Sequence, residues 1–371
     1  MKRFFILLFF IPVLSFAEPM YSPTWGFFID LPEGYEYAGG DARDSFSFEG
    51  PNGAMFDIAV YVRYSGIKEL VSDVHKRIGN KGDVDFFVYN NRQAAVMKLT
   101  FDKYDGLAFA VELDKNNGMQ PILIALAYGP AKEKALEMFH LSALDSICPS
   151  QAERRYPGPI IDYSYPRGGQ KRAVIATGNV NILIRENDAE ASQVFIEREF
   201  QLLQNYVNSD KWQAAWIRYY RSIYRDSYDR IANIASMIVR SWGAPPSGGD
   251  AERRAFAQRA LNLVQNYKYE RTQKGSDFLN LVTAITEGRG DCDSRAMICA
   301  ILLSQAGMRA AMMISRQYSH AMGLVDVGGS GARFESNGVK WLVAETTANV
   351  EIGLIAQDVS DPNHWLGVVF D

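Results

Sequence analysis

The segment from Gly288 to Gly307 constrains the fold of this chain more than any other. Glycines on both sides of Arg289 predict a loop, and the apolar residues after Asp291 predict a buried helix that stops at Gly307. Asp291 has the side chain of an N-cap, which places Cys292 in the first turn of that helix. Backbone N–H groups and the positive end of the helix dipole favour a thiolate over a thiol at such a position. The sequence therefore predicts a nucleophilic cysteine at the start of a buried helix.

A histidine and an acid follow this cysteine on two predicted strands. His320 begins the first strand, which ends at Val327, and Glu345 ends the second strand, which Gly338 precedes. If the strands pair antiparallel with His320 opposite Glu345, then Val327 lies opposite Gly338 and the connection forms a loop. Directly opposed side chains are about 5 Å apart at Cβ, close enough for a hydrogen bond between imidazole and carboxylate. Cysteine, histidine and acid are the nucleophile, base and orienting group of thiol acyl transfer.

The first residues predict export. Met1–Arg3 is basic, Phe4–Val13 is apolar, and Ser15–Ala17 resembles a small-residue cleavage motif. This pattern is typical of a secretory signal peptide over residues 1–17. No later stretch is long and apolar enough for a membrane helix, so we expect a mature chain without a membrane span, either periplasmic or secreted.

Composition narrows the classes of partner and cofactor. The formal net charge of -4 gives no argument for a nucleic-acid partner, and three cysteines and four isolated histidines offer no metal-ligand spacing. We therefore expect no metal and no cofactor. Cys292 and Cys299 lie roughly 10 Å apart on one helix, beyond disulfide reach. A bond from Cys148 to Cys299 is conceivable, but a core position for Cys299 is the preferred interpretation.

The chain is long enough for two domains. Residues 18–150 predict an α+β module, 151–170 a linker, 171–250 a hairpin and two long helices, and 251–371 a second domain. The predicted strands and helices of the module alternate or run apolar between glycine-rich turns: 25–32, 45–49, 55–62, 86–89, 94–101, 107–113 and 121–128 as strands, and 67–78 and 132–145 as helices. This arrangement, with the piece Ile29–Gly34, is weakly similar to PsbP-like domains, which pack an antiparallel sheet against helices. His75 and His140 stand alone on its helices and predict no site.

A strongly aromatic helix is predicted over residues 210–242. Its tryptophans, tyrosines and isoleucines recur at three-to-four spacing with arginines between them. A core helix whose arginines pair with carboxylates such as Asp226 and Asp229 is the preferred interpretation. A nucleic-acid or peptide-binding stripe, and a surface for assembly, are the alternatives.

Several short motifs follow in a characteristic order from residue 262 onward. They are Asn262–Tyr269, Gly290–Ser294, Leu302–Gly307, Ser319–Ala321 and Ala344–Thr347. Together they resemble the transglutaminase-like superfamily over roughly residues 250 to 355. The resemblance implies a papain-like site in which Cys292 is the nucleophile, His320 the general base and acid, and Glu345 the orienting carboxylate. Glu345 stands where this family usually has aspartate.

These observations lead to one functional hypothesis and one alternative. The hypothesis is an exported α+β protein whose C-terminal domain is a papain-like thiol hydrolase or acyl transferase acting on peptide or amide bonds. Hydrolysis is favoured, because nothing marks a site for a second amine. The backbone N–H of Cys292 and the side chain of Gln265 are the candidate oxyanion donors, and Arg316 to Tyr318 are candidates for a rim of the cleft. The alternative is an inactive envelope protein that holds a peptide or cell-wall fragment in the same cleft; the sequence leaves the oligomeric state open.

Overall fold

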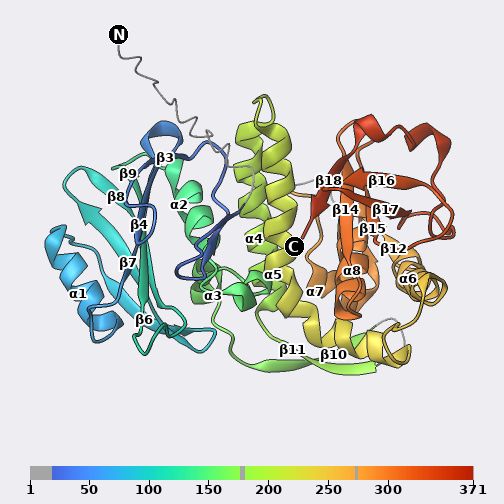
Figure 1. Ribbon diagram of the computed structural model, residues 1–371, viewed down its shortest axis with the longest axis horizontal. Coiled ribbons are helices and arrows are strands. Elements are labelled where there is room, and N and C mark those ends of the chain that lie inside the picture. The colour runs from blue at the N-terminus through green and yellow to red at the C-terminus, as the bar shows by residue number, and fades with distance from the viewer. Residues whose placement is uncertain (1–18, 176–179, 272–274, 371) are drawn as a thin grey trace, which may run out of the picture.

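The computed structural model describes residues 19–175, 180–271 and 275–370. Helices make up 37% and strands 28% of it, which confirms the predicted mixture of helix and sheet. Two lobes flank a pair of long helices (Figure 1). The predicted signal peptide at 1–17 and the predicted hairpin turn at 177–179 lie outside the described residues.

The N-terminal lobe is a seven-stranded antiparallel sheet with a helix on each face. Met97 packs with α1 (Ile67–Arg77) on one face, and Val96 packs with α2 (Leu136–Asp145) on the other. Because both faces are covered, the central strands are almost continuously apolar. The strands in sheet order are β3 (Glu36–Gly39), β4 (Ser45–Glu49), β5 (Met55–Tyr61), β9 (Ile122–Pro130), β8 (Tyr104–Glu112), β7 (Arg92–Phe101) and β6 (Val84–Tyr89).

The strands predicted from residue 45 to residue 128 are all present in this sheet, with ends that differ by a few residues. The stretch predicted at 25–32 contributes only β2 (Phe28–Ile29), which pairs with β1 (Met20–Tyr21) in a separate two-stranded ribbon. The edge strand β3 is not predicted, because its residues are mostly exposed and show no alternation. The similarity to PsbP-like domains stays a prediction.

The segment predicted as a linker, residues 151–170, is folded against both halves of the molecule. It forms the 3₁₀ helix η2 (Gln151–Arg155) and the helix α3 (Pro159–Ser164). Proline at the first helical position suits a helix start, so the proline content of this segment does not mark an extended chain. Ile160 joins the core of the N-terminal lobe and Ile161 joins the core that follows. The hairpin β10 (Gln170–Ile175) and β11 (Val180–Arg185) comes next, as predicted.

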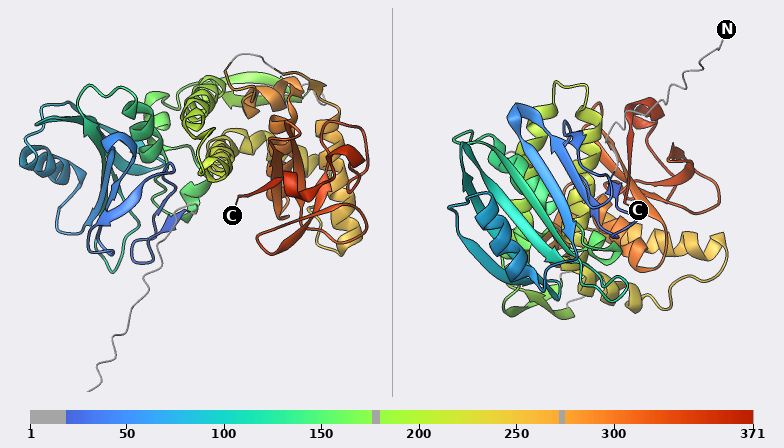
Figure 2. Two further views of the ribbon diagram at one scale, coloured as in Figure 1. Left: turned by 90° about the horizontal axis from the view of Figure 1, so that it is seen from above. Right: turned by 60° about the vertical axis from the view of Figure 1, so that its left-hand side comes forward.

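Two long helices form the centre of the molecule. They are α4 (Asp188–Leu203), extended by η3 (Gln204–Tyr206), and α5 (Trp212–Ser241). Figure 2 shows them between the two lobes. Most of the aromatic face of α5 is buried in one hydrophobic core with the C-terminal lobe, which confirms the interpretation of a core helix. The predicted boundary at residue 250 therefore does not separate two cores.

The arginines of α5 are only partly paired as predicted. Arg230 lies 2.8 Å from both Asp226 and Asp188, a buried ion-pair group. Arg225 differs, because its guanidinium donates to backbone carbonyls, including that of Ile147 at 2.7 Å. The four carbonyls belong to Asp145, Ile147, Glu153 and Tyr156, in the segment from the end of α2 to just past η2. The prediction of a carboxylate partner is therefore wrong for Arg225.

The C-terminal lobe is a five-stranded antiparallel sheet covered on one face by α8 (Cys292–Gln305). Almost every residue of α8 is buried, as its continuous apolar sequence predicts, and the helix ends before Gly307. The strands in sheet order are β16 (Arg333–Ser336), β17 (Val339–Ala344), β15 (His320–Val325), β14 (Ala310–Ser315) and β18 (Leu366–Val369). The remaining elements are α6 (Asp250–Gln265), α7 (Leu281–Glu287), and the short parallel pair β12 (Lys268–Tyr269) and β13 (Arg289–Gly290).

The two strands that carry the histidine and the acid pair antiparallel, but not in the predicted register. Val325 lies opposite Leu342, so each residue of β15 faces a position two residues further along β17 than predicted. The predicted loop between them also contains β16. β16 pairs with β17, and β15 ends at Val325, so the connection between the two strands runs from residue 326 to residue 338 and is longer than predicted.

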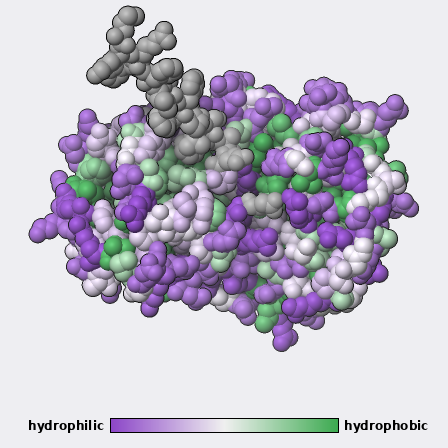
Figure 3. Space-filling view, in the orientation of Figure 1, coloured by the Kyte–Doolittle hydropathy of each residue, from purple (hydrophilic) through white to green (hydrophobic). Residues whose placement is uncertain are grey.

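The surface shows no large apolar region in the view of Figure 3. Hydrophilic residues cover most of this face, and hydrophobic residues form small patches on both halves. Among the described helices, none combines the length and the apolar character needed to cross a bilayer.

Candidate active site

Cys292 is the first residue of α8 and lines a cavity of about 200 Å³. Asp291 caps the helix as predicted: its Oδ1 accepts a hydrogen bond of 2.7 Å from the backbone N–H of Ser294. Gly290 precedes the cap with φ +159°, where a Cβ would lie 2.4 Å from the Ser294 hydroxyl oxygen. The cap at Asp291 and the conformation of Gly290 thus explain how the backbone enters α8. Cys292 is only 2% exposed, although it lines the cavity.

His320 lines the same cavity from the start of β15. The four-residue turn after β14 delivers it, with Ser319 in the left-handed conformation at φ +47°. Its Nε2 lies 2.9 Å from Glu345 Oε2. Because Glu345 occupies Nε2, Nδ1 is the ring nitrogen that remains for the cysteine sulfur.

Glu345 lies just beyond β17, and hydrogen bonds fix both its side chain and its backbone. The backbone N–H and the hydroxyl of Thr347 donate to Oε1 at 2.7 and 2.6 Å, which leaves Oε2 for the imidazole. Burial would raise the pKa of Glu345, but the hydrogen bonds from His320 and Thr347 outweigh it and hold this pKa below its usual value. The carboxylate is therefore ionised and able to stabilise an imidazolium.

Gln265 does not reach the cavity as the predicted oxyanion donor. Its side-chain N–H groups donate to the backbone carbonyls of Glu345 at 2.8 Å and Val350 at 3.0 Å. Two backbone acceptors in the turn after β17 thus use both amide hydrogens. Gln265 supports the backbone of Glu345, so we correct its predicted role.

The electrostatic surroundings of Cys292 differ from the simple helix-start argument. Burial raises the pKa of its thiol far above the usual range, and the charges of Asp293 and Asp291 raise it further. The backbone N–H of Ala321 and the Arg271 guanidinium act in the opposite direction but are weaker. Burial and the two carboxylates thus favour the neutral thiol over the thiolate that the helix start predicts.

Three carboxylates converge beside the cysteine. Asp277, Asp291 and Asp293 each offer an oxygen atom, and these three atoms lie within 4.8 Å of one another. Burial raises the pKa of both Asp291 and Asp293, and the repulsion from their acidic neighbours adds to it. Arg271 forms an ion pair with Asp277 and offsets part of this charge. Within the described residues this cluster is where a cation would find ligands. The spacing of cysteines and histidines in the sequence could not reveal it, because all three ligands are aspartates.

Two aromatic residues that the sequence analysis did not assign to the site also contact it. The Tyr220 hydroxyl of α5 donates to Asp293 Oδ1 at 2.7 Å. The Trp365 ring packs edge-on against the His320 ring, with centroids 6.1 Å apart, and is itself buried. Tyr220 was visible only as one of many aromatics on α5, and Trp365 only as the neighbour of His364.

Other histidines and the other two cysteines lie outside this cavity. His364 contacts the Tyr318 hydroxyl at 2.9 Å on the surface, and His75 contacts the Gly82 carbonyl in the N-terminal lobe. Cys148 and Cys299 are both free and buried, and Cys299 is a core residue as predicted.

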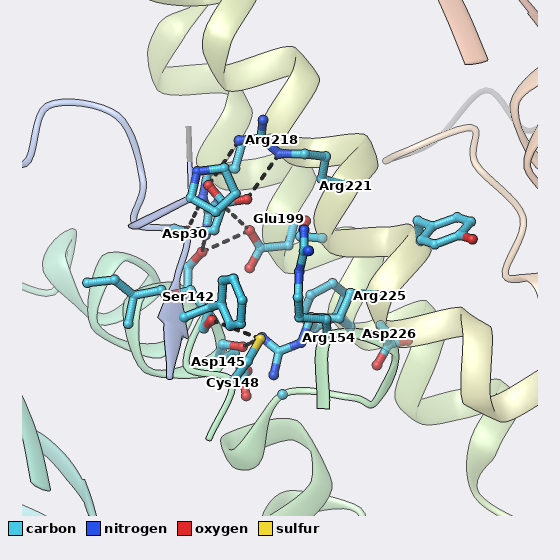
Figure 4. Close-up of a pocket in the computed structure, with 18 of the residues that line it drawn as sticks. Asp30, Ser142, Asp145, Cys148, Arg154, Glu199, Arg218, Arg221, Arg225 and Asp226 are labelled. Atoms are coloured by element: carbon cyan, nitrogen blue, oxygen red, sulfur yellow. Dashed lines mark hydrogen bonds and ion pairs between the residues drawn. The ribbon is translucent and has the colours of Figure 1, made fainter. Parts of the chain in front are cut away.

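A second cavity, of about 70 Å³, lies between the central helices and the N-terminal lobe (Figure 4). Its charged residues pair with one another: Arg218 lies 3.0 Å from Glu199 and donates to Ser142 at 2.8 Å, and Arg221 lies 2.9 Å from Asp30. These ion pairs fasten α4 and α5 to the N-terminal lobe. We assign this cavity to the packing of the lobe and not to catalysis.

Comparison with protein-family models and with characterised protein sequences finds no match. Among solved structures, the chain is similar to a protein from Bacteroides thetaiotaomicron (11% identity, 58% of this chain and 78% of that chain, TM-score 0.26). It is also similar to a provisionally named cysteine protease from Cytophaga hutchinsonii (9% identity, 88% and 78%, TM-score 0.25). A third is calcium-bound LapG of Legionella pneumophila (18% identity, 47% and 81%, TM-score 0.19). TM-scores of this size do not identify a common fold, so the geometry of the site carries the functional conclusion.

Proposed function

We propose that this chain is a thiol hydrolase of the transglutaminase-like, papain-like type that acts on peptide or amide bonds. Cys292 is the nucleophile, His320 the general base and acid, and Glu345 the carboxylate that orients the imidazole. The observation that carries the proposal is the 2.9 Å hydrogen bond between His320 and Glu345 beside the cavity that Cys292 and His320 line together.

The reaction follows from these positions. The Cys292 sulfur forms a bond to the carbonyl carbon while its proton passes to Nδ1 of His320. The imidazolium then gives this proton to the leaving amine as the C–N bond breaks, which leaves a thioester. Water attacks the thioester, His320 takes one proton from it and returns a proton to the sulfur, and the acid is released.

Two features of the cavity support this sequence of steps. A helix start leaves the first backbone N–H groups without intrahelical acceptors, so the N–H of Cys292 is available to the oxyanion. Because burial and two carboxylates keep the thiol neutral at rest, His320 takes the proton during the attack and not before it. Hydrolysis is proposed over transfer to a second amine, because the sequence marks no site for such an amine.

The proposal includes export through the signal peptide predicted at residues 1–17. The substrate would then be a peptide or protein of the cell envelope or its surroundings, met in the periplasm or after secretion. Fractionation and N-terminal sequencing of the mature protein test this step, with Glu18 expected as the first residue.

A second candidate function is a binding protein that holds a peptide or cell-wall fragment without turnover. Its support is the state of the cysteine: Cys292 is 2% exposed and its pKa is raised, and both properties slow nucleophilic attack.

Labelling with iodoacetamide between pH 5.5 and 9 separates the two candidates. For the enzyme we expect selective modification of Cys292 over the buried Cys148 and Cys299, and slower modification in His320→Ala. His75→Ala is the matched control in the other lobe. Incubation with envelope peptides, followed by hydroxylamine, should release a hydroxamate from a Cys292 thioester. Uniformly slow labelling in all variants, together with no hydroxamate, would favour the binding protein instead.

A further inference from the structure

The catalytic cavity continues into a second hollow along the central helices. The second hollow has a volume of about 160 Å³ and shares four lining residues with the catalytic cavity. The shared residues are Phe200, Leu203, Trp216 and Arg316. We call the second hollow the aromatic groove. The aromatic groove therefore adjoins the cavity that Cys292 lines.

The walls of the aromatic groove are apolar and open. Trp212 and Trp216 stand one helical turn apart on α5, with ring centroids 5.9 Å apart, and both are only half-buried. Val207, at the far end, is 36% exposed. Trp212 and Trp216 are therefore aromatic side chains of α5 that the core covers only in part. A cavity of about 150 Å³ accommodates a benzene ring, so the groove has room for one large apolar side chain.

A positive charge stands where the groove meets the catalytic cavity. Arg316 lies on the turn between β14 and β15, four residues before His320, and is exposed. Its guanidinium donates to the Val207 carbonyl at 3.3 Å and lies 5.6 Å from the centre of the Trp212 ring. Among the described residues no carboxylate pairs with Arg316, whereas Arg271, the other arginine at the cavity, pairs with Asp277. Arg316 therefore keeps donors for a group brought by a ligand.

We propose that the aromatic groove and Arg316 form the specificity subsite for a peptide substrate in which a large apolar or aromatic residue stands next to an acidic residue. The apolar side chain fills the groove and packs against the two tryptophans, and the acidic side chain pairs with Arg316. This places the neighbouring peptide bond over Cys292. The inference rests on the proposed function for the cleavage step, but the binding step does not depend on it.

Binding of three defined decapeptides to the full-length Cys292→Ala chain tests the subsite without turnover. The peptides differ only at two central positions, which hold Phe-Asp, Phe-Lys or Ala-Asp, and the quenching of tryptophan fluorescence or calorimetry gives Kd. We expect the Phe-Asp peptide to bind at least tenfold more tightly than either of the others. Adding Arg316→Glu should reverse the order of the Asp and Lys peptides, and Trp212→Ala should remove the advantage of Phe over Ala.

Two control substitutions lie on the exposed hairpin, away from the groove. Arg172→Glu makes the same change of charge as Arg316→Glu, Val174→Ala removes an exposed apolar side chain, and both should leave the order intact. Equal Kd values for the three peptides, no binding of any, or an unchanged order in Arg316→Glu would overturn the subsite. A failure of the enzyme proposal would be seen in a separate measurement. The chain that keeps Cys292 would then be labelled slowly by iodoacetamide and would not cleave the peptide that binds best.

Discussion

Replacing Glu345 by glutamine should impair the site through the tautomer of His320. The backbone N–H of Thr347 can only donate, so it requires an oxygen at the position of Oε1, where it now donates at 2.7 Å. In Glu345→Gln the amide oxygen must stay there, and the NH₂ group then faces Nε2 of the imidazole. Nε2 becomes an acceptor and the ring proton moves to Nδ1, the atom that must accept the proton of Cys292.

The size of the effect follows from the charge-assisted hydrogen bond between imidazole and carboxylate, which a neutral amide cannot provide. A hydrogen bond to a charged group contributes about 1.5–3 kcal/mol, and about 1.4 kcal/mol corresponds to a tenfold change in rate. We therefore expect the second-order rate of iodoacetamide labelling at pH 7 to fall roughly 10- to 160-fold. The rate should then rise with pH as for an unassisted thiol, because the thiolate must form without the imidazole.

A graded series makes the measurement decisive. Thr347→Val removes only the hydroxyl donor at 2.6 Å and keeps the backbone N–H, so its rate should fall by about tenfold, less than in Glu345→Gln. Glu351→Gln changes an exposed carboxylate a few residues away and is the control. A Glu345→Gln chain labelled within threefold of the control across pH 5.5–9 would refute the tautomer argument.

Three other substitutions test neighbouring parts of the site. Asp293→Asn removes a negative charge near the Cys292 sulfur, so labelling at pH 7 should be on the order of tenfold faster. Because the pKa of Asp293 is raised in the folded protein, the protonated carboxyl stabilises the fold, and this stabilisation is lost as pH rises through that pKa. The loss of Tm between pH 4 and pH 8 should therefore be smaller in Asp293→Asn. An unchanged loss of Tm would contradict the argument. Gly290→Ala places a Cβ 2.4 Å from the Ser294 hydroxyl and should lower Tm in thermal melts followed by circular dichroism. Gln265→Leu leaves the backbone carbonyls of Glu345 and Val350 without their hydrogen-bond donor, so it should lower both Tm and the labelling rate. If Gln265 were only an oxyanion donor, its loss would leave Tm unchanged.

The local features of the site were predictable because short-range chemistry determines them. The Asp291 cap, the position of Cys292 at the helix start and the end of α8 before Gly307 depend on neighbouring residues only. The contact between His320 and Glu345 was also expected, although the predicted register was wrong by two residues. A shift of two keeps each side chain on the same face of the sheet. Extending the observed register places Glu345 diagonal to His320, and diagonal neighbours remain within reach of long side chains.

The features that depend on tertiary packing could not be predicted. Asp277 and Asp293 approach each other only when the turn before α7 folds over the start of α8. Gln265 was assigned to the cavity because it precedes the nucleophile in sequence, but the turn after β17 offers two carbonyls to its amide. We expected a carboxylate partner for Arg225 because α5 carries several carboxylates, but backbone carbonyls between Asp145 and Tyr156 accept its hydrogen bonds. In each case a distant segment supplies the partner that decides the role of the side chain.

Because the thiol of Cys292 is neutral, its activation as a nucleophile depends mainly on His320. A helix start stabilises a nearby negative charge by about 0.3–1 kcal/mol and at most about 2 kcal/mol, and one pKa unit corresponds to about 1.4 kcal/mol. The helix start can therefore lower the thiol pKa by little more than one unit, while burial and the charges of Asp293 and Asp291 raise it much further. A cysteine in these surroundings becomes a nucleophile only if a base takes its proton as it attacks. The base can do so only in the tautomer that Glu345 selects, and Thr347 in turn selects which carboxylate oxygen Glu345 presents.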